Sequence, residues 1–152
     1  MTHEFILVIP ARYNSTRLPG KPLIDIAGKI MIQRVYEQCL KAVESSKIFI
    51  ATDDNRIREK CEEFGAQVVM TSANCLTGTD RVAEISSIIS AKYYINIQGD
   101  EPLFNPSDIV AMIGELKSLE EDCVLVGYCP ILSREEFESP YIPKAVFSKE
   151  NL

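Results

Sequence analysis

The sequence contains a single histidine, His3, close to its N-terminus. Because chain ends tend to fray, we do not expect a catalytic triad or a general base built on this histidine. Five cysteines occur, but none forms a Cys-x-x-Cys pair and their number is odd. Neither a disulfide framework nor a zinc site is therefore expected, and this cysteine usage favours a reducing, cytoplasmic location.

Long apolar runs are also missing. No stretch approaches the roughly 20 apolar residues that a membrane span requires. The N-terminus shows no basic segment followed by an apolar one, so we expect neither a signal peptide nor a membrane partner. The net charge is −6, which argues against a nucleic-acid partner, since such proteins usually present a basic face.

Acidic residues are absent from residues 5–24, although they outnumber basic residues in the chain as a whole. This span carries Arg12, Arg17 and Lys21. We interpret an acidic protein with one purely basic loop as arranged to receive a small anion. A solvated basic loop is the alternative interpretation.

Short apolar runs alternate with segments of helical periodicity along the chain. The apolar runs predict strands at residues 5–9, 47–51, 67–70 and 93–97, with two more at 124–128 and 144–147. Apolar residues three and four positions apart predict helices over residues 32–43, 57–64, 82–89 and 109–116. This alternation indicates one α/β domain, residues 1–152, with a Rossmann-like, mostly parallel sheet and helices on both faces.

Turn and capping residues place the ends of these helices. Asp53 and Asp54 can cap the second helix, and Gly65 can stop it. The third helix is predicted to start around Thr79 or Asp80. Asn105 can cap the fourth helix, because a proline follows it at the first helical position.

The basic loop, residues 10–21, follows the first predicted strand. In open α/β sheets, ligands bind outside the carboxyl ends of the strands. Gly20 would let the backbone approach phosphate oxygens closely, and Arg12 and Lys21 would supply charged contacts. A P-loop is excluded because Pro22 follows Lys21, and no Gly-x-Gly-x-x-Gly motif occurs.

A second polar segment, Gln98-Gly-Asp-Glu-Pro, ends the fourth strand. A carboxylate at this edge of the sheet can hold Mg²⁺, which prefers oxygen ligands and phosphate co-ligands. Asp100 is the better candidate because it would face the basic loop, and Glu101 is the second. Alternatively, the two acids only cap the turn before the proline.

The third polar segment is Thr77-Gly-Thr-Asp-Arg81, at the start of a helix. Free backbone N–H groups at this helix end could meet a base or a ribose, and Arg81 could point at the same cleft. Taken in isolation, the segment is explained better by an ordinary helix cap. Catalysis by histidine and a metal site built from cysteine and histidine are both excluded. The chemistry that fits is displacement at phosphorus, assisted by a metal ion such as Mg²⁺ and without a protein nucleophile.

Taken in this order, the segments closely resemble the 3-deoxy-manno-octulosonate (Kdo) cytidylyltransferases. The resemblance runs along the whole chain and rests on the blocks Ile9–Leu23, Ala51–Asp54, Met70–Thr71, Gly78–Arg81 and Asn96–Pro102, followed by Pro140–Phe147. It implies a nucleotide-diphospho-sugar transferase fold. It also implies that CTP and Kdo give CMP-Kdo and pyrophosphate with Mg²⁺, for lipopolysaccharide biosynthesis.

The resemblance also implies roles for individual residues. Arg12, Lys21 and Asp100 would be the catalytic residues: the two cations would bind the triphosphate and stabilise the leaving pyrophosphate, while Asp100 would hold Mg²⁺. The remaining nucleotide-binding residues would be Pro10, Ala11, Arg17, Gly20, Thr77, Gly78, Arg81 and Gln98.

Family members continue well beyond the point where this sequence stops, and we therefore expect a C-terminally truncated member. The missing part supplies most of the Kdo pocket, the dimerisation hairpin of the homodimer and a second metal-binding aspartate. Two alternatives stay open: a non-catalytic relative that binds CTP, and a nucleotidyltransferase for another sugar acid.

Overall fold

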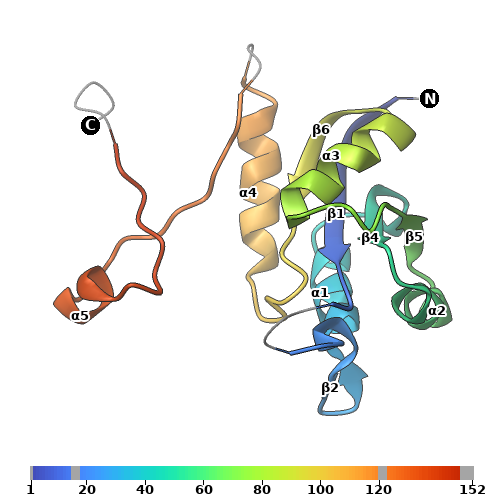
Figure 1. The fold of residues 1–152 in the computed structure, drawn as a ribbon. Helices are drawn as coiled ribbons and strands as arrows, with labels where there is room; N and C mark the ends of the chain where they lie inside the picture. Colours follow the sequence, from blue (N-terminus) through green and yellow to red (C-terminus); the bar gives the residue numbers. More distant parts are fainter. Residues whose placement is uncertain (1, 15–17, 120–122, 148–152) are drawn as a thin grey trace.

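The computed structural model describes residues 2–14, 18–119 and 123–147. Its centre is a parallel sheet of four strands in the order β5-β4-β1-β6 (Figure 1). The strands are β1 (His3–Ala11), β4 (Ile48–Thr52), β5 (Gln67–Met70) and β6 (Ala91–Asn96). The four strands predicted at these places are confirmed: the bounds of β5 are as predicted, and the ends of the others move by one or two residues.

Five α-helices accompany the sheet in the described residues: α1 (Met31–Leu40), α2 (Asn55–Glu63), α3 (Gly78–Ile88), α4 (Pro106–Leu116) and α5 (Arg134–Glu138). Two short 3₁₀ helices, η1 (Lys21–Leu23) and η2 (Ser45–Lys47), and a small hairpin of β2 (Asp25–Ile26) and β3 (Lys29–Ile30) complete it. The first four α-helices correspond to the predicted ones.

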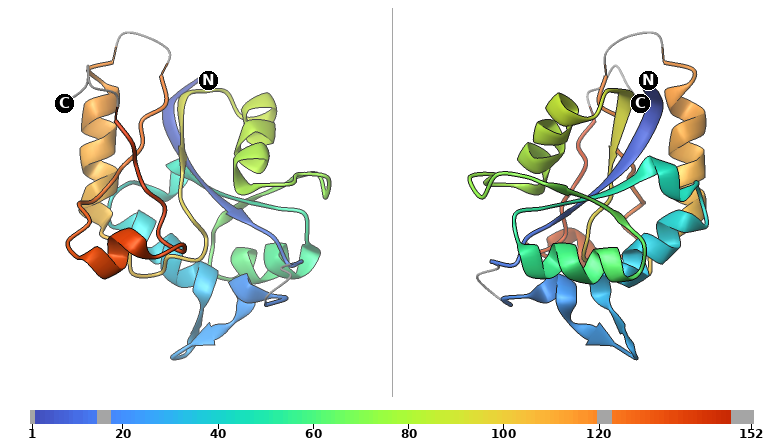
Figure 2. Two further views of the ribbon diagram at one scale, coloured as in Figure 1. Left: turned by 60° about the vertical axis from the view of Figure 1, so that its left-hand side comes forward. Right: turned by 90° about the vertical axis from the view of Figure 1, so that its right-hand side faces the viewer.

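Alternate residues of β1 pack into two separate hydrophobic clusters. Leu7 and Ile9 belong to a cluster that α1, α2 and α4 cover, whereas Ile6 and Val8 face α3. All four side chains are fully buried. Helices therefore cover both faces of the sheet, as the sequence predicts, and Figure 2 shows α3 on one side with α1 and α4 on the other.

The order of the strands follows from the direction in which the chain winds. From β1 the chain moves outward to β4 and β5 through α1 and α2, which lie on one face. It then returns through α3, on the other face, and adds β6 beside β1. Because parallel crossovers are right-handed, reversing direction requires a change of face. The reversal leaves a topological switch point between β1 and β6, where open α/β sheets bind their ligands.

The helix starts bear out the capping predictions with one shift. Oδ1 of Asp54 accepts the backbone N–H of Arg56 at 2.9 Å and caps α2, and Asn105 caps α4 in the same way. The cap of α3 is Thr77 rather than Thr79 or Asp80, because the Thr77 side chain and the Asp80 carboxylate satisfy each other's backbone N–H groups.

The strands predicted at residues 124–128 and 144–147 are wrong. In the described part of this region, no strand pairs with either segment, and the only regular element is α5. Side chains of the first segment are largely exposed, with Val124 at 89%. Their β-branched composition favours a strand, but a strand forms only where a neighbour completes its hydrogen bonds. Figure 1 shows this region running away from the sheet.

None of the helices in the described residues is long and apolar enough to cross a membrane.

The cysteines differ in burial, and buried and exposed thiols should differ in their reactivity. Cys39 and Cys61 are fully buried, and burial raises the pKa of each thiol to about 12. Cys123 and Cys129 are exposed.

Since the thiolate is the reactive form, iodoacetamide should alkylate the exposed pair in the folded protein and the buried pair only after denaturation, as measured by mass spectrometry. Equal rates for Cys39 and Cys123 would contradict this packing.

Candidate functional site

A cavity of about 210 Å³ lies at the carboxyl ends of β1 and β6, at the switch point of the sheet. It is lined by Pro10, Ala11, Arg12, Lys21, Pro22, Cys75, Thr77, Gly78, Arg81, Gln98, Gly99 and Asp100. All of them except Pro22 and Cys75 come from the three polar segments of the sequence. Among the predicted site residues that the structure describes, all except Gly20 line the cavity. Arg17 lies outside the described residues.

The floor of the cavity depends on a close approach between two backbone segments. Gly99 follows β6, and a Cβ atom at this position would lie 2.9 Å from the carbonyl oxygen of Pro10. A Cβ atom at Gly78 would lie 3.2 Å from the ring of the same proline. The ends of β1 and β6 and the start of α3 therefore meet around Pro10, with room only for glycine at the tightest point.

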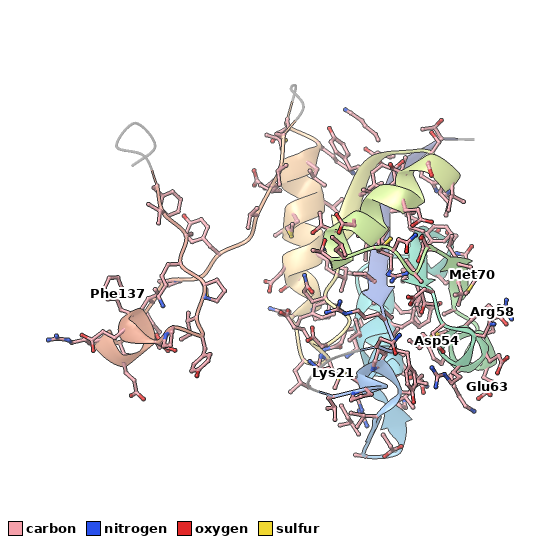
Figure 3. The ribbon with its side chains drawn as sticks, in the orientation of Figure 1. Lys21, Asp54, Arg58, Glu63, Met70 and Phe137 are labelled. Atoms are coloured by element: carbon pink, nitrogen blue, oxygen red, sulfur yellow. The ribbon has the colours of Figure 1, made fainter. Side chains whose placement is uncertain are left out.

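Lys21 and Asp100 form an ion pair across the cavity, with Nζ and Oδ2 2.5 Å apart. Both side chains remain about one-third to one-half exposed. Figure 3 shows Lys21 beyond the carboxyl end of β1. The predicted opposition of a basic loop and a carboxylate is thus present. Glu101, the alternative candidate, is exposed and does not line the cavity.

The donor set around Asp100 can be compared with the needs of Mg²⁺. Within the described residues, no cluster of three or more histidine, cysteine, aspartate or glutamate side chains could hold a metal alone. Mg²⁺ is nevertheless usually held by one or two carboxylates together with substrate phosphates. The Asp100 carboxylate already accepts the Lys21 ammonium, so it is placed to receive a cation in this cavity.

Tyr13 holds the basic loop in place and is not among the residues that line the cavity. Its carbonyl accepts the N–H of Gly20 at 2.8 Å, and its ring lies 3.1 Å from where a Gly20 Cβ would be. The guanidinium of Arg56 stacks on the ring at 3.3 Å and is itself paired with Asp54. Gly20, at φ 71, is therefore needed for the turn and for packing against Tyr13; a contact with phosphate stays a prediction.

Arg81 is the most buried charged side chain of the site, only 3% exposed. It donates hydrogen bonds to the hydroxyl of Thr71 and to the carbonyl of Ser72, and it lies 3.4 Å from Oδ1 of Asp53. The guanidinium thus ties the ends of β4 and β5 to α3. Its predicted contact with a nucleotide would have to use the part of the side chain that lines the cavity.

The wall of the cavity next to α3 is a loop, residues 72–77, that sequence analysis did not assign. Cys75 lines the cavity from this loop. The Glu84 carboxylate accepts hydrogen bonds from the backbone N–H of Ser72 and from the Cys75 thiol. These bonds lower the pKa of Glu84, and the glutamate raises the pKa of the thiol. Helical spacing places Glu84 on the same face of α3 as Arg81, three positions earlier, but it does not reveal the contact with the loop.

A polar cavity at the switch point of a parallel sheet is the arrangement of nucleotide-binding α/β domains. The cytidylyltransferase family model matches residues 6–152 of this chain. The chain therefore belongs to the cytidylyltransferase family, and the resemblance inferred from its motifs is confirmed.

Two relatives carry the name 3-deoxy-manno-octulosonate cytidylyltransferase. The protein of Protochlamydia amoebophila is 44% identical over 154 residues, which cover 99% of this chain and 60% of the relative. The Escherichia coli protein is 41% identical over 143 residues, covering 93% of this chain and 57% of the relative. The chain thus spans about 60% of the length of the relatives that it matches.

Solved structures share the fold. A CMP:2-keto-3-deoxy-manno-octonic acid synthetase, in complex with CTP, superposes with a TM-score of 0.73 at 43% identity, covering 76% of this chain and 48% of that one. A cytidylyltransferase from Leptospira borgpetersenii gives a TM-score of 0.69 at 21% identity, covering 78% of this chain and 50% of that one. The second similarity extends to the fold alone.

Gly99→Ala tests the close approach beneath the cavity. We expect a loss of about 1–3 kcal/mol in the free energy of unfolding, because the added methyl group would overlap a backbone carbonyl that cannot move freely. The measurement is urea unfolding followed by circular dichroism. Gly114→Ala is the matched control: a Cβ atom there meets nothing within 4 Å, and it should cause no loss. Equal stabilities for the two variants would contradict the contact.

Proposed function

We propose that this chain provides the nucleotide-binding part of an enzyme that transfers CMP from CTP to Kdo and releases pyrophosphate. The observation that carries the proposal is the Lys21–Asp100 pair across a cavity whose other walls are Pro10–Arg12 and the start of α3. Relatives that match almost the whole chain are named for this reaction, and a similar structure is described as a complex with CTP.

In this proposal the cations of the basic loop bind the triphosphate. Arg12 and Lys21 lie on the β1 side of the cavity, where they would hold the outer phosphates and stabilise the charge on the leaving pyrophosphate. The anomeric hydroxyl of the sugar forms the new bond to the α-phosphorus, and the bond to pyrophosphate breaks. Thr77, Gly78 and Gln98 would contact the nucleoside, with the N-terminus of α3 favouring negative charge nearby.

Asp100 would hold Mg²⁺ together with phosphate oxygens. When bound, the ion would neutralise charge on the phosphates and on the leaving group. Lys21 pairs with one oxygen of the same carboxylate, so it would compete with the metal for Asp100, and the phosphates would offer it a new partner. A cytoplasmic location and a homodimeric assembly belong to the same proposal, and the five free thiols fit a reducing compartment.

The reaction itself provides the first test. With CTP, Kdo and Mg²⁺, we expect pyrophosphate release that falls at least about a hundredfold in Asp100→Asn, because a positioned group at a charged transition state contributes on this order. Glu101→Gln, a neighbouring carboxylate that does not line the cavity, should retain activity. Sugar acids other than Kdo serve as competing acceptors, and faster turnover with one of them would replace Kdo in the proposal.

Calorimetry with CTP and Mg²⁺ separates binding from turnover. Binding without pyrophosphate release would assign to this chain a nucleotide-binding role and no transfer. Absence of CTP binding would contradict the proposal altogether.

Lys21→Ala tests which part of the nucleotide this lysine contacts. We expect CTP affinity to fall about tenfold or more, as for loss of a charge-assisted hydrogen bond, while CMP affinity changes much less because CMP lacks the outer phosphates. Lys29→Ala is the control, since Lys29 pairs with Glu37 outside the cavity. An equal loss for CTP and CMP would indicate that Lys21 serves the fold instead.

A further inference from the structure

Glu84 contacts the loop of residues 72–77 at two points. Its carboxylate oxygens lie 2.9 and 3.0 Å from the backbone nitrogen of Ser72, where the loop leaves β5. The same carboxylate also accepts the Cys75 thiol at 3.0 Å. Glu84 itself lies two turns inside α3 and does not line the cavity.

The rest of the loop is held by separate contacts. The hydroxyl of Ser72 accepts the N–H of Asn74 at 3.0 Å, and the carbonyl of Leu76 receives a long contact of 3.4 Å from Arg12. The loop then ends in the capping box of Thr77. Arg81 also donates to the carbonyl of Ser72 at 3.4 Å, and the N–H of Cys75 meets the same carbonyl at 3.5 Å. Among these contacts, those of Glu84 are the ones that reach both the backbone of Ser72 and the thiol of Cys75.

We infer that Glu84 is a positioning residue for nucleotide binding: it holds the 72–77 loop as the wall of the cavity that faces the nucleoside. Rotation of this carboxylate would release the N–H of Ser72 and the Cys75 thiol together, and the wall would lose its fixed shape. The inference rests on the proposed function, because it assigns the nucleoside to the α3 side of the cavity and the phosphates to Arg12 and Lys21.

This geometry makes the expected effect selective. A ligand that consists of phosphates alone should use the basic loop and should be indifferent to the 72–77 loop. A nucleotide should require both walls. A residue that only stabilised the fold would affect both ligands equally, so a comparison of CTP with inorganic triphosphate distinguishes positioning from general stability.

The experiment compares Glu84→Ala and Glu84→Gln with the unchanged chain. Calorimetry in the presence of Mg²⁺ should show CTP affinity falling about tenfold in the alanine variant and less in the glutamine variant, which keeps one acceptor. The affinity for inorganic triphosphate should stay within about twofold. The glutamine variant also provides the answer if the alanine variant does not fold.

Glu37→Ala is the matched control. Glu37 is another helical glutamate with several hydrogen bonds, to Lys29 and Gln33, outside the cavity. It should lose stability to a similar extent without loss of CTP affinity. Unchanged CTP binding in both Glu84 variants, or an equal loss for CTP and triphosphate, would overturn the inference.

Hydrogen exchange provides a readout that does not depend on CTP. The amides of residues 72–75 should exchange faster in Glu84→Ala than in Glu37→Ala, while those of β1 stay protected. If the unchanged chain fails to bind CTP, the proposed function is contradicted. Amide hydrogen exchange still decides whether Glu84 holds the loop. Equal exchange rates for residues 72–75 in Glu84→Ala and Glu37→Ala would overturn the inference that it does.

Discussion

The contact between the ends of β1 and β6 determines where the cavity lies and which polar residues meet in it. The N–H of Ile97 donates to the carbonyl of Val8 at 2.9 Å, and Gly99 then passes directly over the carbonyl of Pro10. This approach brings the segment after β6 against the basic loop after β1. Residues almost eighty positions apart in sequence, Lys21 and Asp100, become partners as a result.

The handedness of the crossovers explains why this contact falls where it does. β6 can lie beside β1 only after the chain has reversed direction, and the reversal carries α3 to the opposite face of the sheet. The same helix then presents its N-terminus to the cavity and its buried face to the sheet. Winding, helix placement and the position of the cavity are therefore consequences of one topological constraint.

The sequence was sufficient for features that depend on local patterns. The buried strands β1 and β4 are nearly continuous apolar runs, and the helices that cover them show regular spacing, so both could be read directly. The three polar segments of the cavity follow strands or begin a helix, and the switch-point rule brings them together. Asp100 could be preferred over Glu101 for the same reason.

Features that depend on tertiary contacts were not predictable. The segment around Val124 has strand-forming residues, yet no neighbour pairs with it in the described structure. Thr77 becomes the cap of α3 through its exchange of hydrogen bonds with Asp80, and a start two residues later was equally consistent with the pattern. The bonds of Arg81 and Glu84 to the 72–77 loop cross between elements, so spacing alone could not reveal them.

Two walls of the cavity, the basic loop and the 72–77 loop, follow strands that differ in how well their hydrogen bonds are protected. β1 is hydrogen-bonded along both sides and its central side chains are fully buried, whereas β5 pairs only with β4 in the described sheet. Local opening of a protein begins where the fewest contacts must break. The basic loop thus follows the most protected strand, whereas the 72–77 loop follows an edge strand of the described sheet and can open more readily. Helix α3 itself stays packed on β1 through Val82 and Ile85. In the proposed function, this difference would let the 72–77 loop move as a nucleotide enters or leaves while Arg12 and Lys21 keep their places.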